Sequence, residues 1–403
     1  MLVKTLLPAF MAVGSAMAQT PTATCSATGG QATINSQADA GQYSGCKKIS
    51  GSIIIGPNAP GSIDLSGPSE ITGDLKVLNN GIIERFSSSD LTTVGGAFEM
   101  KNVTKLISVN LPKLKSVKTL TWQSLTRLET IDLAVTKADE ISVSDTFLKS
   151  LKGLDVTSIK KLDINNNRLL TTFTSSLGSL DDLLNIQANG IGLSVSLPNL
   201  VWIANMTIAN VTSFSAPSLA TVNGSARFDS NYFESFSAPN LTATQSGDIS
   251  FVGNGKLSNV SFPVLERIGG GLLIANNTEL SELTGFPKLK AIGGAVKLRG
   301  SFKEAAFPAL EDVRGAFDIS STEDISGVCE VFDKQAPQNQ GGNGNIQGTY
   351  SCTSNNSRAN EDTSSTGSIG GGTKNDKKNG AVGMTLNTVL FALVGVAGFA
   401  VAL

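Results

Sequence analysis

The sequence predicts an all-β protein, a right-handed parallel β-solenoid of about thirteen stacked leucine-rich-repeat-like coils. Two apolar residues separated by one position recur thirteen times between Ser52 and Val328, and this alternation is typical of a short strand. The second members of these pairs are 20 to 24 residues apart, and the 264 residues from Ile55 to Ile319 give a period of 22 over twelve steps. A repeat of this length indicates a stacked array, because each coil can bury its apolar side chains only against its neighbours.

The apolar pairs place the thirteen predicted strands at Ile53/Ile55, Leu75/Val77, Phe98/Met100, Leu120/Trp122, Ile141/Val143, Leu162/Ile164, Leu184/Ile186, Met206/Ile208, Ala226/Phe228, Ile249/Phe251, Leu272/Ile274, Val296/Leu298 and Phe317/Ile319. The stretch from Glu266 to Gly294 shows one complete coil. After its strand, Phe286 to Leu289 is predicted as a second extended edge, since Pro287 disfavours a helix. One short helical turn is expected between Ser176 and Leu184, where leucines have helical spacing.

An asparagine follows the second apolar residue by three positions in seven coils. An amide at a turn can bond backbone groups and its neighbours in adjacent coils. We therefore interpret the series as a structural ladder without a catalytic role, formed by Asn58, Asn80, Asn167, Asn189, Asn231, Asn254 and Asn277.

Composition limits the possible functions. The 403 residues include 31 Lys and Arg against 33 Asp and Glu, so the balance of charge implies neither nucleic acid nor an acidic surface as a partner. There is no histidine, and this excludes catalysis by Ser-His or Cys-His nucleophiles and most zinc sites. We expect no cofactor and no metal.

Residues 1–18 are predicted to be a secretory signal peptide. Lys4 precedes an apolar run, and Ala16-Met17-Ala18 provides small residues for cleavage after Ala18. The alternative is a short buried helix. Cleavage would start the mature chain at Gln19.

Secretion predicts that the four cysteines form disulfides. Cys25 and Cys46 precede the first coil, within a cap at 19–50, and Cys329 and Cys352 follow the coils of 51–328, within a cap at 329–352. Thirteen coils rising about 4.8 Å each keep the two ends far apart, so we expect Cys25–Cys46 and Cys329–Cys352.

The C-terminal part predicts a stalk and a lipid anchor. From Gln335 to Lys378 the chain is rich in Gln, Asn, Gly, Ser and Thr, and we expect no folded structure, with an O-glycosylated stalk at 353–379. Residues 380–403 read as a removed GPI signal, with Asn379 as the attachment residue, Gly380 as the second choice and Gly371 or Gly372 as further alternatives. A transmembrane anchor is disfavoured, because the apolar run from Val389 to Leu403 is too short to span a bilayer.

The segment from Leu162 to Leu169, LDINNNRL, matches a leucine-rich core pattern. The coils resemble the receptor L-domain, and the order of signal, cysteine-capped repeats, stalk and anchor signal resembles the fungal GPI-anchored cell-wall organisation proteins of the extracellular-mutant family. The resemblance covers nearly the full chain. It implies a glycoprotein of the outer plasma membrane leaflet and the wall, required for wall integrity and without chemistry of its own.

Eight sequons are predicted as N-glycosylation sites in a secreted protein. Three of them, Asn102, Asn210 and Asn276, occupy the same turn of different coils, where a glycan can point outward. The full set is Asn102, Asn205, Asn210, Asn223, Asn240, Asn259, Asn276 and Asn355.

Two further functions are alternatives to wall organisation. A polysaccharide-active enzyme needs paired carboxylates, and the outward strand positions contain no two neighbouring acids, although Asp181, Asp182 and Asp248 in loops stay open. A sugar-binding face needs exposed aromatic rings, and only Trp202 is a candidate, with a partly buried position as its alternative, while Trp122 falls in the inward register. We expect a monomeric, non-enzymatic organiser that binds wall polysaccharide or wall proteins through the polar face of the sheet, with a receptor-like sensor or adhesin as another alternative.

Overall fold

The structure is a computed structural model that describes residues 23–361. The predicted signal peptide (1–18), the predicted attachment residue Asn379 and the predicted GPI signal (380–403) lie outside the described residues. Within that range, no helix is long and apolar enough to cross a membrane.

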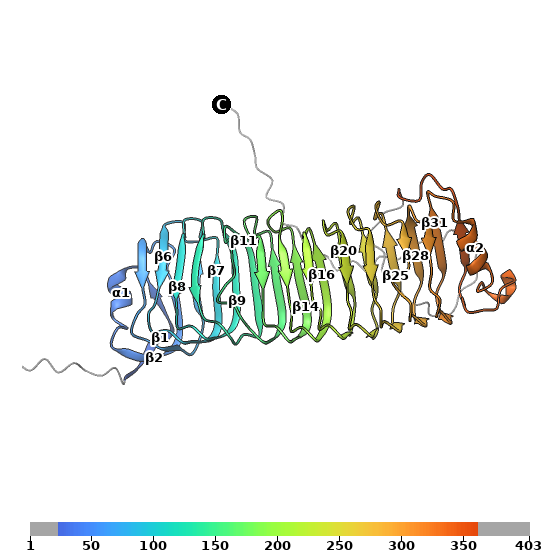
Figure 1. Ribbon diagram of the computed structural model, residues 1–403. Helices are drawn as coiled ribbons and strands as arrows, with labels where there is room; N and C mark the ends of the chain where they lie inside the picture. The colour runs from blue at the N-terminus through green and yellow to red at the C-terminus, as the bar shows by residue number, and fades with distance from the viewer. Residues whose placement is uncertain (1–22, 362–403) are drawn as a thin grey trace, which may run out of the picture.

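The chain forms an elongated parallel β-solenoid, with α1 at one end and α2 at the other (Figure 1). Its main sheet has 21 strands, all paired in parallel within the solenoid. They are β1 (Ala23–Ile34), β2 (Cys46–Ile55), β4 (Glu70–Ile71), β5 (Leu75–Leu78), β7 (Thr93–Lys101), β9 (Ser116–Leu125), β11 (Glu140–Thr146), β12 (Ser158–Asn165), β14 (Ser179–Gln187), β16 (Trp202–Ala209), β18 (Thr221–Val222), β19 (Ala226–Asp229), β21 (Ala243–Thr244), β22 (Ile249–Val252), β24 (Arg267–Ile268), β25 (Leu272–Ala275), β27 (Ala291–Ile292), β28 (Val296–Gly300), β30 (Asp312–Val313), β31 (Phe317–Ser321) and β32 (Tyr350–Thr353).

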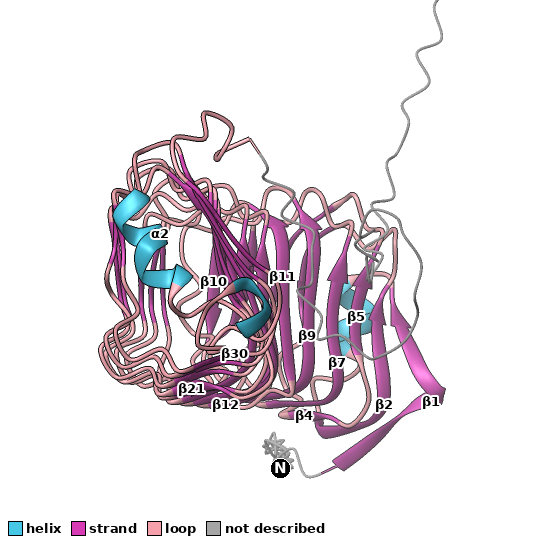
Figure 2. Cartoon of the chain, turned by 90° about the vertical axis from the view of Figure 1, so that its right-hand side faces the viewer, coloured by secondary structure: helices cyan, strands magenta, loops and turns pink. Residues whose placement is uncertain are grey.

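Four smaller sheets lie across the core from these strands, as the view along the axis shows (Figure 2). They contain β3 (Gly61–Asp64), β6 (Ile83–Ser87), β8 (Ser108–Leu111) and β10 (Thr130–Leu133); β13 (Thr172–Thr174), β15 (Ser194–Ser196) and β17 (Ser213–Ser215); β20 (Ser235–Ser237) and β23 (Asn259–Ser261); and β26 (Glu282–Leu283) and β29 (Glu304–Ala305). The helical segments are α1 (Gln37–Gly41), α2 (Ser326–Asp333) and the 3₁₀ turn η1 (Gln338–Gln340).

The strand register follows the apolar pairs. Phe251 pairs with Ile274, and Ile274 pairs with Leu298, so apolar side chains stack in columns inside the solenoid. Both members of each pair are buried, and phenylalanine rings continue the stacking, with the rings of Phe228 and Phe251 4.7 Å apart. The predicted fold and inward register, including Trp122, are confirmed.

The solenoid has about fourteen turns, one more than predicted, because the N-terminal cap is itself a coil. Ile34 of β1 pairs with Ile55 of β2, so the cap extends the apolar column. At the other end Cys352 of β32 pairs with Ile319 of β31. Both predicted disulfides are present, Cys25–Cys46 and Cys329–Cys352, and they join strands and helix at the two ends of the stack.

Each coil turns a corner directly after its strand. The residue two positions after the second apolar member has φ between 52° and 68° in ten consecutive coils. Asparagine, aspartate and glycine tolerate this left-handed conformation better than other residues, which explains much of the polar sequence at the corner. The residues are Asn79, Asn102, Ser124, Asp145, Asn166, Ala188, Asn210, Ser230, Gly253 and Asn276.

The predicted second extended edge at Phe286–Leu289 is wrong. The second strand of that coil is β26, and Pro287 begins a turn in which the Leu289 N–H donates to the Phe286 carbonyl at 3.3 Å. Proline favours this turn position because its φ is fixed near the required value. The same backbone bond spans Pro112, Pro198, Pro217, Pro239, Pro263 and Pro308.

Two other expectations are wrong. Residues 335–361 are folded: Ile346 is buried and forms a bridge to Val313, and β32 extends the main sheet. The expected helical turn at 176–184 is instead the start of β14, whose leucines enter the core across a strand irregularity between Leu180 and Leu183.

Candidate functional site

The outward face of the main sheet carries a continuous row of polar side chains, nearly all uncharged, on strands β9 to β16. These strands form the middle of the solenoid (Figure 1). Pairing places Thr121, Ser142, Asp163, Asn185 and Thr207 in one column and Gln123, Ser144, Asn165 and Gln187 in the next. We call these nine residues the polar strip. Asp163 is its one charged member, and the strip contains no aromatic ring.

Asp163 organises the centre of the polar strip. Its Oδ1 accepts hydrogen bonds from Asn165 Nδ2 and Asn185 Nδ2, each at 2.8 Å. These two bonds orient both amides, and the amide oxygens stay available as acceptors. The centre therefore presents fixed hydrogen-bonding groups on a rigid strand, which is an arrangement suited to a hydroxyl-rich ligand.

Ion pairs border the polar strip on its N-terminal side. Asp74 bonds Lys76 at 2.9 Å, and Glu99 pairs with Lys101. The hydrogen bond from Lys76, together with one from the Ala97 N–H, lowers the pKa of Asp74 below its ordinary value of 3.8. The bond to Asp74 in turn raises the pKa of Lys76.

The C-terminal side is also charged. Arg299 forms an ion pair with Asp318, and Arg227 lies two residues before Asp229 on the same face. Burial raises the pKa of Asp229, against the opposing effect of Arg227. The polar strip, in which Asp163 is the one acidic side chain, thus lies between two ion-paired ends of one face.

The predicted asparagine ladder lies beneath the corner next to this face. Asn231 Nδ2 donates to Asn254 Oδ1 at 3.0 Å, and Asn254 Nδ2 donates to Asn277 Oδ1 at 3.0 Å. A second run joins Asn167 to the half-buried Asn189 at 3.1 Å. These bonds satisfy buried corner groups, so the ladder has the structural role that was predicted.

Two asparagines stand apart from those runs. Asn80 is buried and donates to the carbonyls of Gly56 and Ala59. Asn58 is exposed, so its predicted place in the ladder is wrong. Pro57 occupies its corner position, and proline cannot adopt the positive φ that turns the next residue inward.

The acids left open by the sequence lie at two separate places in the structure. Asp248 Oδ1 accepts the Gly271 N–H at 2.7 Å and so supports the backbone of the next coil. Asp181 and Asp182 are both exposed at the irregularity of β14, where two residues of this strand stand opposite one residue of β16. Within residues 23–361, no three His, Cys, Asp or Glu side chains are grouped as metal ligands.

Sequence reasoning missed one acidic pair. Glu282 of β26 and Glu304 of β29 are in register on neighbouring strands of a small sheet, and both are exposed. The signal was present in the sequence, because both glutamates precede an inward apolar residue at the same place in consecutive coils.

The sequons and the tryptophan have defined positions. Asn102, Asn210 and Asn276 adopt the left-handed corner conformation, and Asn205 lies outward on the main face. Asn259 belongs to β23 of a small sheet, and Asn223, Asn240 and Asn355 are exposed outside the strands. Trp202 is half-buried at the start of β16, as the alternative for this residue predicted. It is therefore not an exposed stacking platform.

The fold and the face define a class of protein: a disulfide-capped parallel β-solenoid with one long polar face. A family model described as Ecm33, GPI-anchored cell wall organization protein, matches residues 1–44. The chain is 35% identical to protein ecm33 of Aspergillus fumigatus over 87% of this chain and 85% of that protein. It belongs to the Ecm33 family of fungal GPI-anchored cell wall organisation proteins.

Other relatives agree with this assignment. A cell surface GPI-anchored protein of Arthroderma benhamiae is 36% identical over 76% of this chain and 78% of that protein. The cell surface GPI-anchored protein ECM33 of Candida albicans is 30% identical over 77% of this chain and 75% of that protein. No solved structure matches the chain.

Proposed function

We propose that the protein organises the fungal cell wall by binding a wall polysaccharide along the polar strip, without catalysing a reaction on it. The observation that carries this proposal is the in-register interval of amides and hydroxyls, with Asp163 as its one acidic side chain, between two charged ends of the main face. Neutral polysaccharide chains offer repeated hydroxyl groups, and amide and hydroxyl side chains can both donate to and accept from them.

The repeat makes a long ligand more suitable than a small one. Neighbouring strands of the main sheet are spaced about 4.8 Å apart, so the polar strip offers a regular series of weak sites along the solenoid axis. Each exposed hydrogen bond contributes little in water, about 1 kcal/mol. A chain that contacts several coils at once gains affinity through effective concentration, and a polymer can do this where a monosaccharide cannot.

The distribution of the sequons along the chain also favours the polar strip as the binding surface. Six of the eight lie between Asn205 and Asn276, one is Asn102 and one is Asn355. Residues 103–204, which carry most of the polar strip, contain none. If these sites carry glycans, the middle of the main face stays open to a ligand while neighbouring coils are covered.

Several further features support holding rather than cleaving the polymer. Neighbouring positions of the polar strip supply no carboxylate pair, which glycoside hydrolysis requires. The signal peptide, Asn379 and the removed GPI signal would place the protein at the outer leaflet and the wall. The names of the relatives, which are cell surface and GPI-anchored proteins, support that location. A fixed protein with a polymer-binding face would link membrane to wall.

The experiment is a pull-down of the secreted Gln19–Lys378 form on insoluble β-glucan, chitin and mannan, with an assay for released oligosaccharide. Gln123→Glu with Gln187→Glu adds two charges to exposed positions of the polar strip, while Ser194→Glu with Ser215→Glu adds two to exposed positions of a small sheet. We expect one polysaccharide to retain the wild type and the control, and the strip variant to lose at least about tenfold in retention, the equivalent of two lost contacts. Equal retention of both variants, failure of all three polymers or release of oligosaccharide would refute the proposal.

A further inference from the structure

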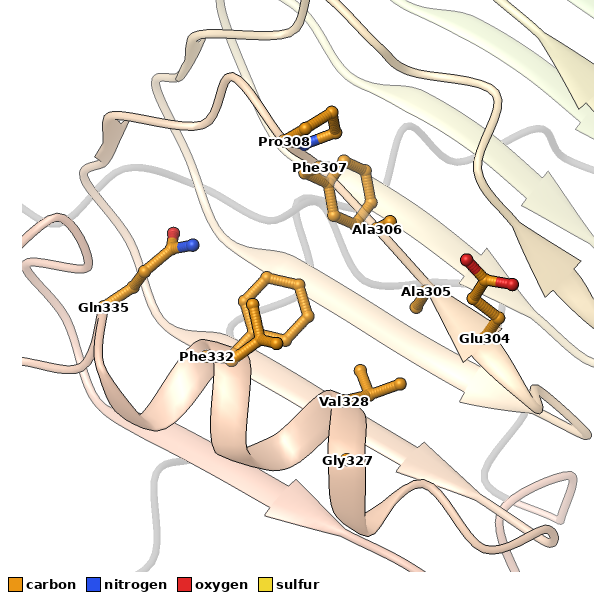
Figure 3. Close-up of a pocket in the computed structure, with 10 residues that line it drawn as sticks. Glu304, Ala305, Ala306, Phe307, Pro308, Gly327, Val328, Phe332 and Gln335 are labelled. Carbon is orange, nitrogen blue, oxygen red and sulfur yellow. The ribbon is translucent and has the colours of Figure 1, made fainter.

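A cavity of about 370 Å³ lies between the last coil and the C-terminal cap (Figure 3). One wall is β29 and the turn after it, with Glu304, Ala305, Ala306, Phe307 and Pro308. The other wall is α2 and the residue that follows its end, with Gly327, Val328, Val331, Phe332 and Gln335. The cavity is thus formed by the cap and a small sheet, away from the polar strip.

The lining is apolar except for Glu304 and Gln335, and Gln335 carries an unsatisfied polar atom. Phe307 and Phe332 are buried, while Val331 is 53% exposed at the rim. Gln335 extends from the end of α2 toward the wall that carries Phe307 and Pro308 (Figure 3), and its Oε1 is buried without a hydrogen-bond partner. A buried acceptor of this kind is normally bonded, so a donor N–H or O–H in the cavity would satisfy it once the Gln335 side chain rotates to expose its oxygen.

The acidic pair adds a charge preference. Glu304 lines the cavity, and Glu282 is its in-register neighbour on β26, about 4.8 Å away along the stack. Like charges at adjacent positions of a sheet are unfavourable, and within residues 23–361 neither glutamate forms an ion pair. A cationic group placed beside both carboxylates would remove this repulsion.

We propose that this cavity binds a peptide segment of a partner protein, which inserts one aliphatic or aromatic side chain and places a neighbouring Lys or Arg on Glu282 and Glu304. A backbone N–H of the segment bonds Gln335 Oε1. A sugar fits less well, because Ala305, Pro308, Val328 and Val331 offer no side-chain hydrogen bonds to its hydroxyl groups. The site goes beyond the proposed function, since it would link the wall organiser to a second protein.

The test is selection of a random-peptide display library on the immobilised, secreted Gln19–Lys378 form. We expect enriched peptides to combine an apolar residue with Lys or Arg within two positions. Synthetic versions of these peptides should lose at least tenfold in affinity toward Glu282→Lys with Glu304→Lys, and toward Val331→Asp. Glu84→Lys, a charge reversal at an exposed position of β6, should leave affinity unchanged.

A second variant separates binding from folding. Gln335→Leu removes the unsatisfied acceptor, so its melting temperature should match or exceed that of the wild type while peptide affinity falls. Each variant is checked by thermal unfolding and by retention on the wall polysaccharide, which should persist. No enrichment over the doubly reversed variant, enrichment of acidic peptides or equal affinity for all variants would overturn the proposal.

Discussion

Replacing Asn254 with alanine tests whether the asparagine ladder stabilises the corner of the coils. Asn254 is fully buried. Its Nδ2 donates to the Phe228 carbonyl at 2.9 Å and to Asn277 Oδ1 at 3.0 Å, and its Oδ1 accepts the backbone N–H of Asn231 at 2.8 Å and Asn231 Nδ2 at 3.0 Å. The substitution removes all four bonds at once.

The cost follows from the groups that lose their partners. Asn277 Oδ1 keeps the backbone N–H of Asn254, and Asn231 Nδ2 keeps the Ile208 carbonyl, so these two amides stay bonded. The buried Asn231 N–H loses its acceptor, and the Phe228 carbonyl loses an amide donor. The Phe228 carbonyl keeps the Val252 N–H of the strand ladder, so one buried group is left unsatisfied. Such a group costs about 1 to 3 kcal/mol, so we expect the free energy of unfolding to fall by roughly 1 to 3 kcal/mol.

Urea unfolding of the secreted Gln19–Lys378 form measures this loss, and hydrogen exchange locates it. We expect faster exchange in β19, β22 and β25, which flank the corner. Asn58→Ala is the matched control, because Asn58 has the same repeat position but is exposed, and its effect should stay within about 0.5 kcal/mol. If the two variants differed by less than 1 kcal/mol, the ladder would not contribute the stability assigned to it.

Three further perturbations test register, electrostatics and anchorage. Ile274→Asp places an unpaired carboxylate in the core, so it should lower the free energy of unfolding by several kcal/mol and block secretion. Leu273→Asp, on the outward face, should still be secreted. Equal secretion of the two variants would contradict the register. Asp74→Asn should lower the free energy of unfolding by about 0.5 to 1 kcal/mol at pH 7. Because the pKa of Asp74 is lowered, this difference should vanish as the pH falls below that pKa, and a difference that persists in acid would exclude the ion pair as its cause. Deleting Val389 to Leu403 should release folded protein into the medium, and phospholipase C should release the full-length protein from cells. A truncated protein that stays on cells would contradict the lipid anchor. Full rescue of wall strength by the truncated protein would show that its function does not require anchoring.

The inward register could be predicted because it has a period of two and the core enforces it. Leu272 and Ile274 face inward whatever the loops do, since a slip of one residue would expose the whole column. Turn chemistry was harder to assign. Pro287 is compatible both with an extended segment and with a turn, and only the backbone bond from Leu289 to Phe286 distinguishes the two.

The polar strip on the main face could be predicted from the sequence, whereas the folded C-terminal segment and the cavity at the cap could not. Columns of outward residues follow directly from the period, so the polar strip was visible in the sequence. The folded segment at 335–361 was not, because few apolar residues, among them Ile346, attach a polar segment to the existing sheet. The cavity at the cap was hidden for the same reason: its walls come from β29 and α2, whose packing no local pattern specifies.

The in-register stack also determines how the chain can be built. Every strand of the main sheet after β1 pairs with a strand about one coil earlier, so each new coil needs only the one before it as a template. A chain that enters the secretory pathway from its N-terminus can therefore fold in the order in which it is synthesised, starting from the coil closed by Cys25 and Cys46. The C-terminal cap forms last and covers the growing edge, so until β32 is added, the exposed strand of the newest coil is open to pairing with another chain.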